Sequence, residues 1–346
     1  MNIALLTGFI DHNLNEATKI TIHSLAKELK RQGHFVIIIC KSRKNYKKFE
    51  KINSISVFRF NFWVYLFSMF LLKKKLDIEF DVVHSFSSAP ILVLRTFFVK
   101  LFSKAKIVHT IKSESSSKLG SFKLAFLLRI ADHVTTHTNY IKKKIECNGY
   151  KNVKIINSHI DTKKFKKLNT KQLTKQYKLK KPVVLYYGPF APRKGTDALI
   201  NVIPCVIEKI PDALFLFIIK KTRYFKKSVN KLKNLGLETN IKVLTGKVNL
   251  PDFINLAKVA VFPYPYLKAT EATPSCVLEC LACSTPVITR HVSEINAEGL
   301  YLFKNKEQLC NLIVAGIKKK KKKVIFDSSK YSSETACEQY LSVYSE

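Results

Sequence analysis

Residues 271–289, EATPSCVLECLACSTPVIT, contain two sets of side chains that could carry chemistry. Cys276, Cys280 and Cys283 have the C-x3-C-x2-C spacing that holds an iron–sulfur cluster in radical enzymes. Glu271 and Glu279 frame seven residues, and this pair of carboxylates favours a sugar-nucleotide site instead. The local structure decides between the two, because thiolates that bind one cluster must converge from a loop.

The sequence around the cysteines favours a buried helix over a loop. Thr273 is a suitable N-cap, and Pro274 suits the first helical position. The residues that follow, SCVLECLACS, tolerate a helix, which places the three cysteines in one stripe beside apolar neighbours. Free cysteine is commonly a small core residue, so we interpret these thiols as packing groups and not as cluster ligands.

Glu279 is the only charged residue within 272–289. Burying a lone carboxylate is costly unless a basic neighbour or the hydroxyl groups of a ligand satisfy it. A structural ion pair is therefore one interpretation of Glu279, and a ligand contact is the other. Glu271 precedes the helix, and the helix start, which includes Thr273 and Ser275, attracts phosphate through its N–H groups. Phosphate and hydroxyl contacts together predict a nucleotide-sugar site.

Strands and helices on either side must position these residues. Short apolar runs alternate with longer amphipathic segments, which is typical of parallel sheets covered by helices on both faces. Two series of strands are expected, the first at 2–8, 35–41, 54–60, 81–85, 106–111 and 153–159, and the second at 182–188, 213–219, 241–246, 259–264 and 286–290. They predict two doubly wound α/β domains, separated by the Lys-rich residues 162–181. Ligands of such sheets bind beyond the carboxyl ends of the strands, so we expect the site in the cleft between the domains.

The chain is strongly basic, with a net charge of +35 over 346 residues. Residues 1–180 contain 35 basic and 11 acidic residues, so the first half carries most of this charge. Such a field attracts nucleic acid, anionic lipid or phosphorylated substrates, although a lysine-rich proteome explains it equally well. The eight cysteines lie mostly in apolar segments, which indicates reduced core thiols and no disulfide framework. Because the sequence shows neither a signal peptide nor a membrane-spanning run, we expect a cytoplasmic protein.

Two segments resemble the retaining glycosyltransferases of family 4, which have the GT-B fold. Their E-x7-E signature is similar to EATPSCVLE, and CLACSTPVIT continues it in a manner similar to the family's EAMACGTPVI. The turn YYGPFAPRKGTDALI, residues 186–200, resembles the family's G-R-x4-K-G turn, with Gly188 and Lys194 at the matching separation. Weaker similarities extend along most of the chain.

The resemblance implies two Rossmann-like, doubly wound parallel-sheet domains that face each other across a cleft. We expect the acceptor-side domain at 1–165, a Lys-rich linker at 166–181 and the donor-nucleotide domain at 182–325. Residues 326–346 are expected to form a helix that crosses back to the first domain. The reaction implied is a retaining sugar transfer from a nucleotide-diphosphate sugar, a co-substrate, with neither a cofactor nor a metal ion.

The family's motifs also imply roles for individual side chains. Its turn clamps the donor diphosphate, and the resemblance gives this task to Lys194, helped by Arg193. Glu271 would orient the transferred sugar, and Glu279 would hold the ribose hydroxyl groups. The expected catalytic residues are Glu271, Arg193 and Lys194, and the expected donor-binding residues are Gly188, Lys194, Thr273, Ser275 and Glu279. An ordinary solvated pair in a turn is the alternative for Arg193 and Lys194.

The sequence departs from the family pattern at four places. Pro189 stands where relatives have the clamping Arg, unless Arg193 substitutes for it. Glu16 and its neighbour replace a Gly-Gly pair after the first strand. Lys112 occupies the position of a His that contacts the donor sugar, and His159 replaces a Gly. These departures motivate a rival interpretation, a non-catalytic relative that acts as a binding or partner subunit.

In this fold the first domain supplies most of the acceptor site. There we expect Gly8, Glu16, His84 and Lys112 on the acceptor or sugar side. The alternatives are a surface position for Lys112 and a position at the edge of the core for His84.

Three segments bear on where the protein acts. Residues 60–75 and 91–106 are rich in aromatic residues and end in lysines, which suits either a membrane interface or buried crossover helices. The lysine run at 318–323 indicates a solvated loop or helix end.

The function expected is therefore sugar transfer to a glycolipid, lipid-linked or polysaccharide acceptor in cell-surface glycan synthesis. The expected partners are the nucleotide sugar, the acceptor and an anionic membrane surface at the inner face of the membrane, with no specific nucleic acid. A basic nucleic-acid-binding protein is a second rival, supported by charge alone. A phosphorylase or epimerase on the same fold is a third, because a fold does not fix a reaction.

Overall fold

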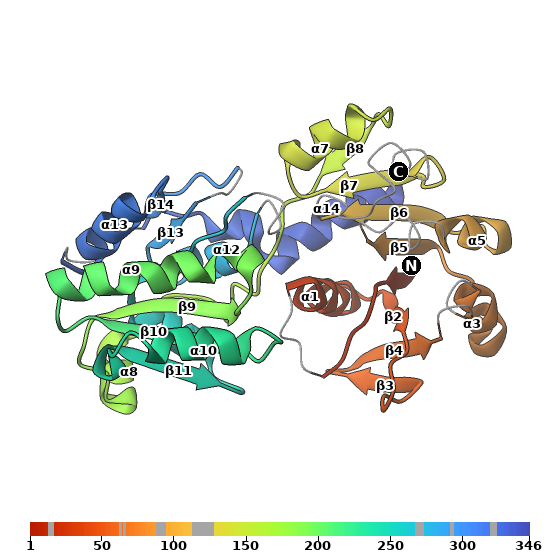
Figure 1. The fold of residues 1–346 in the computed structure, drawn as a ribbon. Coiled ribbons are helices and arrows are strands. Elements are labelled where there is room, and N and C mark those ends of the chain that lie inside the picture. Colours follow the sequence, from red (N-terminus) through yellow and green to blue (C-terminus); the bar gives the residue numbers. More distant parts are fainter. Residues whose placement is uncertain are drawn as a thin grey trace. The chain divides into compact units, whose positions relative to one another are not determined.

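A computed structural model describes residues 1–12, 17–61, 64, 67–87, 95–112, 128–266, 273–290, 294–318 and 324–346. The chain forms two compact units (Figure 1). Unit 1 comprises Met1–Asp161 with Lys330–Glu346, and unit 2 comprises Thr162–Ser329. The segment 166–181, expected as a linker, lies within unit 2 and contains helix α8 (Thr170–Tyr177).

Unit 1 is built on an eight-stranded sheet with the order β3-β4-β2-β1-β5-β6-β7-β8. Neighbouring strands are parallel except for the antiparallel pair β3 and β4. The strands are β1 (Asn2–Leu6), β2 (Phe35–Lys41), β3 (Phe49–Ile52), β4 (Ile55–Phe60), β5 (Val82–Phe86), β6 (Lys106–Ile111), β7 (His133–Thr136) and β8 (Val153–Ile155). Its helices, within the described residues, are α1 (Ala17–Arg31), α3 (Ser68–Leu76), α5 (Arg95–Phe102), α7 (Asn139–Glu146) and α14 (Ser333–Ser345).

Both faces of this sheet are buried. Along β1, Ala4 and Leu6 belong to one hydrophobic cluster, and Ile3 and Leu5 belong to another. Alternate side chains of a strand point to opposite faces, so a continuous apolar strand requires cover on both sides. The near-continuous apolar runs of the sequence thus account for the two helical layers.

The last helix of the chain belongs to unit 1. The Tyr344 hydroxyl on α14 lies 2.6 Å from Nδ1 of His84 on β5, and Nζ of Lys106 donates to the Tyr344 carbonyl at 2.9 Å. Tyr340 is fully buried beside them, with its ring 4.8 Å from that of His84. The expectation that the C-terminal helix returns to the first domain is confirmed.

Unit 2 is built on a six-stranded parallel sheet with the order β11-β10-β9-β12-β13-β14. The strands are β9 (Val183–Pro189), β10 (Leu214–Lys220), β11 (Ile241–Thr245), β12 (Ala257–Phe262), β13 (Val287–Thr289) and β14 (Leu300–Leu302). The helices are α8, α9 (Thr196–Lys209), α10 (Phe225–Lys233), α11 (Leu250–Leu256), α12 (Ser275–Ala282) and α13 (Lys306–Lys318). Short 3-10 turns are η1 (Pro192–Lys194), η2 (Glu238–Asn240) and η4 (Ser328–Tyr331), the last just before α14. Two doubly wound parallel-sheet domains were expected, and this expectation is confirmed.

The structure corrects the sequence analysis in its details. Strands β3, β7 and β14 were not expected, because each is only three or four residues long and carries polar residues or lies at a sheet edge. Helix α12 begins at Ser275 with Pro274 as its N-cap, one residue later than predicted, and Thr273 does not cap it.

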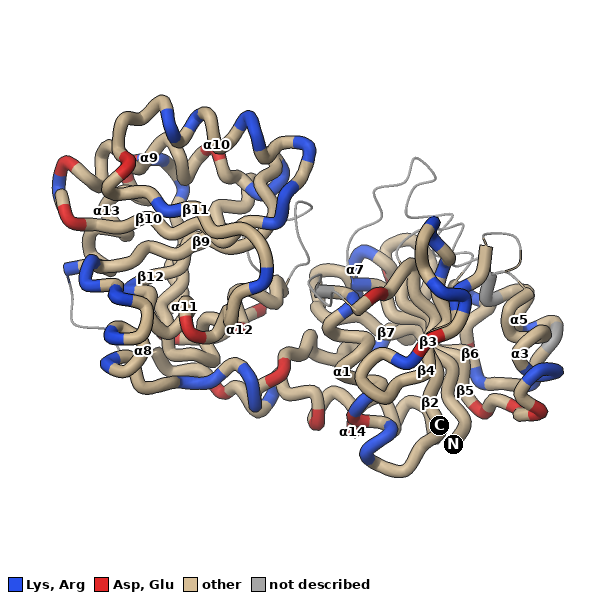
Figure 2. The backbone as a smooth tube through the Cα atoms, turned by 90° about the horizontal axis from the view of Figure 1, so that it is seen from below, with Lys and Arg blue, Asp and Glu red and all other residues tan. Residues whose placement is uncertain are grey.

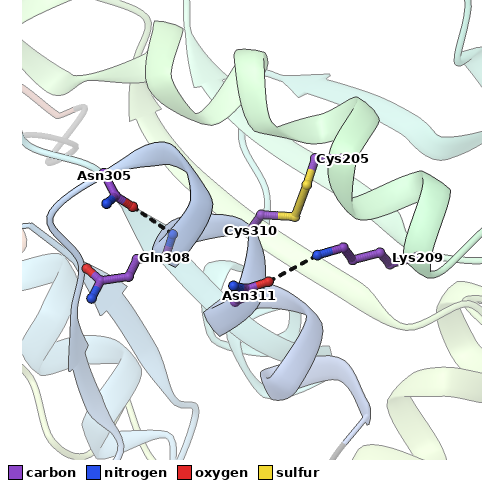
Figure 3. Close-up of a disulfide and its surroundings, with 6 residues drawn as sticks. All are labelled: Cys205, Lys209, Asn305, Gln308, Cys310 and Asn311. Atoms are coloured by element: carbon purple, nitrogen blue, oxygen red, sulfur yellow. Dashed lines mark hydrogen bonds between the residues drawn. A yellow bond between two sulfur atoms is a disulfide. The ribbon is translucent and has the colours of Figure 1, made fainter.

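The expectation that no cysteine forms a disulfide is wrong for one pair. Cys205 on α9 and Cys310 on α13 form a disulfide (Figure 3), with Cα atoms 6.4 Å apart. Both residues lie in apolar helical segments, and α9 and α13 pack side by side, so the two buried faces bring the sulfurs together. The other six cysteines are free thiols.

Within the described residues, no helix is long and apolar enough to cross a bilayer. Lys and Arg residues are distributed over the elements of both units (Figure 2).

Candidate functional site

The turn after β9 is held by two glycines. Gly188 has a φ of +131° and Gly195 a φ of +69°, conformations that side chains with a Cβ rarely adopt. A Cβ on Gly195 would lie 1.6 Å from the carbonyl oxygen of Pro263, which follows β12. Only glycine therefore lets η1 approach the carboxyl end of β12. The approach brings the ammonium of Lys194 to 5.0 Å from the ring centroid of Tyr264.

The carboxylate of Glu279 is buried in helix α12, where 6% of the residue is exposed. Burial raises its pKa to about 7, an effect that the Tyr187 hydroxyl and the Lys164 ammonium partly offset. The Tyr187 hydroxyl donates to Oε2 at 2.6 Å. Glu279 is thus a buried carboxyl group whose pKa lies near neutrality.

Cys276 connects the lysine turn with the carboxylate. The Tyr264 hydroxyl is 3.0 Å from its Sγ, and the Tyr187 hydroxyl is 3.0 Å from its carbonyl oxygen. Burial raises the pKa of the Cys276 thiol to about 12, with Glu279 raising it further and Lys194 lowering it. The Lys194 ammonium and the Glu279 carboxylate therefore both lie close to the Cys276 thiol. Because Cys276 is in the first turn of α12, the cation and the carboxylate both lie beside this turn.

The start of α12 holds a buried polar atom without a partner. Oγ of Ser275, the first helical residue, makes no hydrogen bond to any described residue. The first N–H groups of a helix also lack intrahelical acceptors and carry partial positive charge. Together with Lys194, this end of α12 suits an anion, while Glu279 suits hydroxyl groups of the same ligand.

The structure excludes the iron–sulfur interpretation of the cysteine stripe. Cys276, Cys280 and Cys283 lie on or directly after α12, and burial raises the pKa of the Cys280 thiol well above its usual range. Protonated thiols on one helix do not converge on a metal. No group of three or more ligating side chains within the described part of the chain could hold a metal ion.

The expected donor-side residues lie around the site, directly beside it, or outside the described part of the chain. Gly188, Lys194 and Glu279 lie around the site just described, with Ser275 at the start of α12. Arg193 precedes Lys194 in η1, and Thr273 is buried just ahead of α12. Glu271 lies outside the described residues.

Gly8 and Lys112 follow β1 and β6 at the carboxyl edge of the unit 1 sheet. Lys112 is 7% exposed, and its ammonium lies 5.8 Å from the Phe86 ring centroid. His84 is fully buried, and its Nε2 is 2.7 Å from Oγ1 of Thr110, so both ring nitrogens have partners inside unit 1. His84 therefore holds α14 to the sheet and does not face a ligand. Glu16 lies outside the described residues.

Two buried histidines lie near Lys112: His137, which was not singled out from the sequence, and His159, which stands where relatives have a Gly. His137 donates from Nδ1 to the Ile156 carbonyl at 2.7 Å, and His159 donates from Nε2 to the Thr21 carbonyl at 3.0 Å. Burial and, next, the Lys112 cation lower the pKa of His137 to about 3 and that of His159 to about 4. Both rings are neutral at pH 7. The other nitrogen of each ring has no partner among the described residues, so each presents a lone pair.

The sequence analysis also did not assign the tyrosines and one lysine of the unit 2 site. Tyr187 directly precedes Gly188, and Tyr264 ends the expected strand at 259–264, so their positions at strand ends were a usable signal. Lys164 stands in the Lys-rich segment, where composition gives no reason to prefer it over its neighbours.

Two family models match the chain. Residues 19–164 match the model described as Glycosyltransferase Family 4, and residues 169–308 match that of glycosyl transferases group 1. The boundary between the two matches lies close to the boundary between the two units. No curated protein sequence matches the chain.

Solved structures share the fold at low sequence identity. A glycosyltransferase from Rickettsia africae has a TM-score of 0.74 at 16% identity, over 99% of this chain and 98% of that one. Anabaena HepE in complex with UDP and glucose has a TM-score of 0.71 at 15% identity, over 99% and 94%. A variant of S. aureus TarM in complex with fondaparinux, α-GlcNAc-glycerol and UDP has a TM-score of 0.71 at 11% identity, over 100% of each chain. At these identities the likeness establishes a common fold.

Proposed function

Since this chain belongs to the family 4-like glycosyltransferases of the GT-B fold, we propose that it transfers a sugar, with retention of configuration, from a nucleotide-diphosphate sugar. The observation that carries the proposal is the juxtaposition of the buried Glu279 carboxylate, the Lys194 ammonium and the first turn of α12. A ligand with two phosphates and free hydroxyl groups satisfies all three.

The donor occupies this site through its nucleotide half. The α12 N-terminus, with Ser275 and Thr273, and the cations Lys194 and Arg193 bind the diphosphate. Glu279 accepts hydrogen bonds from the ribose hydroxyl groups, which replace the water lost by burial and favour its ionised form. Gly188 leaves room beside the turn for close approach of the ligand.

The transfer itself is a same-face displacement. The bond between the anomeric carbon and the diphosphate oxygen breaks as the acceptor hydroxyl forms the new bond, and the proton of that hydroxyl passes to the leaving diphosphate oxygen. Lys194 and Arg193 neutralise the charge that develops on the diphosphate, so this scheme uses no metal ion. Glu271 orients the sugar through its hydroxyl groups, and Lys112 contacts the sugar near the reacting carbon.

We assign the acceptor to unit 1, with Gly8 and Glu16 as acceptor-side residues. The acceptor class proposed is a glycolipid, a lipid-linked sugar or a polysaccharide of the cell surface. The basic balance of residues 1–180 supports an acceptor that is anionic or sits in an anionic environment.

The proposal is tested by incubating the purified chain with nucleotide-diphosphate sugars and candidate acceptors, and by reading the anomeric configuration of the product by NMR. We expect turnover of one donor with retention, unchanged by a chelator. Lys194→Ala should lower the rate by about 100-fold, whereas Lys233→Ala, an exposed lysine on α10, should leave it unchanged. Inversion of configuration, or a normal rate for Lys194→Ala, would contradict the mechanism.

Pro189 in place of the clamping arginine favours a second candidate, a non-catalytic binding or partner subunit. A chain that binds a nucleotide sugar but neither transfers nor hydrolyses it, with every acceptor tried, would support this candidate instead.

A further inference from the structure

Helices α3 and α5 of unit 1 lie side by side and are joined by aromatic rings (Figure 1). The ring centroids of Phe67 and Phe98 are 5.1 Å apart, and those of Phe97 and Phe98 are 5.6 Å apart. On the inner side of the pair, Met69, Leu72 and Val99 are buried in one of the hydrophobic clusters of the sheet. The inner faces of both helices are therefore already packed, which leaves the outer faces to be explained.

The outer faces are apolar to an unusual degree. Thirteen large hydrophobic residues are exposed in the described part of the chain, and six of them lie on or just before these two helices. They are Val64 (41% exposed), Phe67 (41%), Phe70 (50%), Leu71 (41%), Phe97 (47%) and Leu101 (63%). Exposed apolar residues are normally scattered singly, so a contiguous group indicates a binding surface. We call these six residues the α3–α5 patch.

Lysines lie beside the α3–α5 patch, in the last turns of both helices. Phe67, Phe70, Leu71 and Lys74 follow one another at helical spacing, so Lys74 shares the outer face of α3 with the aromatic residues. Residues 67–76 contain three lysines, and 95–104 contain an arginine and two lysines, with no acidic residue in either segment (Figure 2).

Two of these lysines already have acidic partners. Lys73 pairs with Glu79, and Lys100 pairs with Asp132 at 2.5 Å. For Lys74 and Lys75, no ion pair to a described residue is present. Two exposed acidic residues, Asp77 and Glu79, directly follow α3, but the exposed lysines of both helices, together with Lys104, outnumber them, so the rim keeps a net positive charge.

We propose that the α3–α5 patch docks unit 1 on an anionic lipid bilayer. Aromatic and aliphatic side chains of a short helix insert at the boundary between headgroups and acyl chains, while lysines at its edge contact anionic headgroups. Helices of nine and eight residues are too short to span a bilayer, so they lie in its plane. The charge of the rim selects lipid over an apolar protein surface, because the lysines need anionic partners once the patch is covered.

The proposal concerns a surface and needs no bound donor, so it stands or fails separately from sugar transfer. If both hold, the patch brings unit 1 to the bilayer in which a lipid-linked acceptor resides. A vesicle-binding result without sugar turnover, or turnover without vesicle binding, would tell the two apart.

The test is cosedimentation of the full chain with vesicles of zwitterionic lipid alone or with about 30 mol% anionic lipid, at low and high salt. We expect at least about 10-fold tighter binding to the anionic vesicles, weakened by salt.

Two pairs of variants separate apolar from charged contributions. Phe70→Ser/Leu71→Ser and Lys74→Ala/Lys75→Ala should each weaken binding to anionic vesicles, the latter by about 30-fold. The controls are Leu302→Ser, which removes a 58% exposed leucine from unit 2, and Lys226→Ala/Lys227→Ala on α10. The controls should bind within about twofold of the wild type.

Three results would overturn the proposal. One is a folded wild type that fails to bind anionic vesicles at low salt, and another is an equal loss of binding in patch and control variants, which would reflect net charge alone. The third is a wild-type dimer that Phe70→Ser/Leu71→Ser converts to a monomer, because the patch would then join two copies of the chain. Circular dichroism of each variant establishes that it is folded.

Discussion

Glu279 is the residue on which the proposed donor site depends most. Its carboxylate is buried and accepts a hydrogen bond from Tyr187. This bond and the charge of Lys164 both lower the pKa of Glu279, but burial outweighs them and the pKa is raised to about 7. When no ligand is bound, the ionised form of Glu279 therefore lowers the free energy of unfolding of the protein. Ribose hydroxyl groups that donate to the carboxylate would remove this destabilisation, which links donor binding to the ionisation of one side chain.

This linkage gives a prediction for the pH dependence of stability. A carboxyl group whose folded pKa is raised from 4.5 to about 7 contributes stability that is complete below pH 4.5 and is lost as pH rises through 7. Glu279→Gln should remove this dependence on pH. From pH 4.5 to 8, the free energy of unfolding of the variant should therefore rise by on the order of 3 kcal/mol relative to that of the wild type. Urea unfolding of both proteins at each pH measures the difference.

Other groups titrate over the same range, so a matched variant is needed. Glu307→Gln, at an exposed position on α13, should follow the wild type at every pH. A Glu279→Gln curve parallel to that of the wild type would show that the carboxyl group is not held in its protonated form by burial.

At the scale of elements, the site depends on the close approach of η1 to the end of β12. A Cβ at Gly195 would overlap the Pro263 carbonyl oxygen, whereas Gly236, with a similar φ of +64°, has no neighbour within 4 Å of a Cβ. Gly195→Ala and Gly236→Ala therefore share the cost of a left-handed alanine, about 1–2 kcal/mol, but only the first adds a clash.

The prediction is that Gly195→Ala destabilises unit 2 by at least about 2 kcal/mol more than Gly236→Ala, and that it also weakens nucleotide binding. Denaturant unfolding and calorimetry measure the two effects. Equal destabilisation by the two variants would mean that the turn moves away from β12 without penalty.

The disulfide between α9 and α13 is a second feature at this scale. It closes a loop of 105 residues within unit 2, and a cross-link of this length stabilises a fold mainly by restricting the unfolded chain. Reduction should lower the unfolding free energy by about 2–4 kcal/mol. The measurement is urea unfolding with and without reductant, with Cys205→Ala/Cys310→Ala as the control. A wild type that responds to the reductant no more than this variant would contradict the prediction.

At the scale of the whole molecule, sequence predicted the sheets better than their edges. Central strands such as β2 and β6 were predicted because parallel strands buried on both faces are continuous apolar runs. Strands β3 and β14 lie at sheet edges and are only four and three residues long, which is too short for periodicity to give a signal. The Cys205–Cys310 pair could not be predicted, because it depends on how two helices 105 residues apart pack.

The candidate site was predictable where a motif fixes the spacing and unpredictable where packing decides. Lys194 and Glu279 follow from motif spacing, but the roles of Tyr187 and Tyr264 arise from the strands that end beside α12. His84 shows the opposite case, because the family resemblance implied an acceptor-side contact, whereas the residue lies in the middle of β5 and α14 covers it. A sequence records which residues stand at the carboxyl edge of a sheet, but not which of them a later helix will cover.

The central claim is that unit 2 binds the diphosphate and ribose of a nucleotide sugar between Lys194 and Glu279. The most direct test is isothermal titration calorimetry with a panel of nucleotide-diphosphate sugars, on the wild type, Glu279→Ala and the exposed-site control Glu307→Ala. We predict that the wild type and the control bind one nucleotide alike, and that Glu279→Ala binds it about 10- to 100-fold more weakly. A folded wild type that binds no nucleotide sugar, or a Glu279→Ala variant that binds as well as the wild type, would contradict the account.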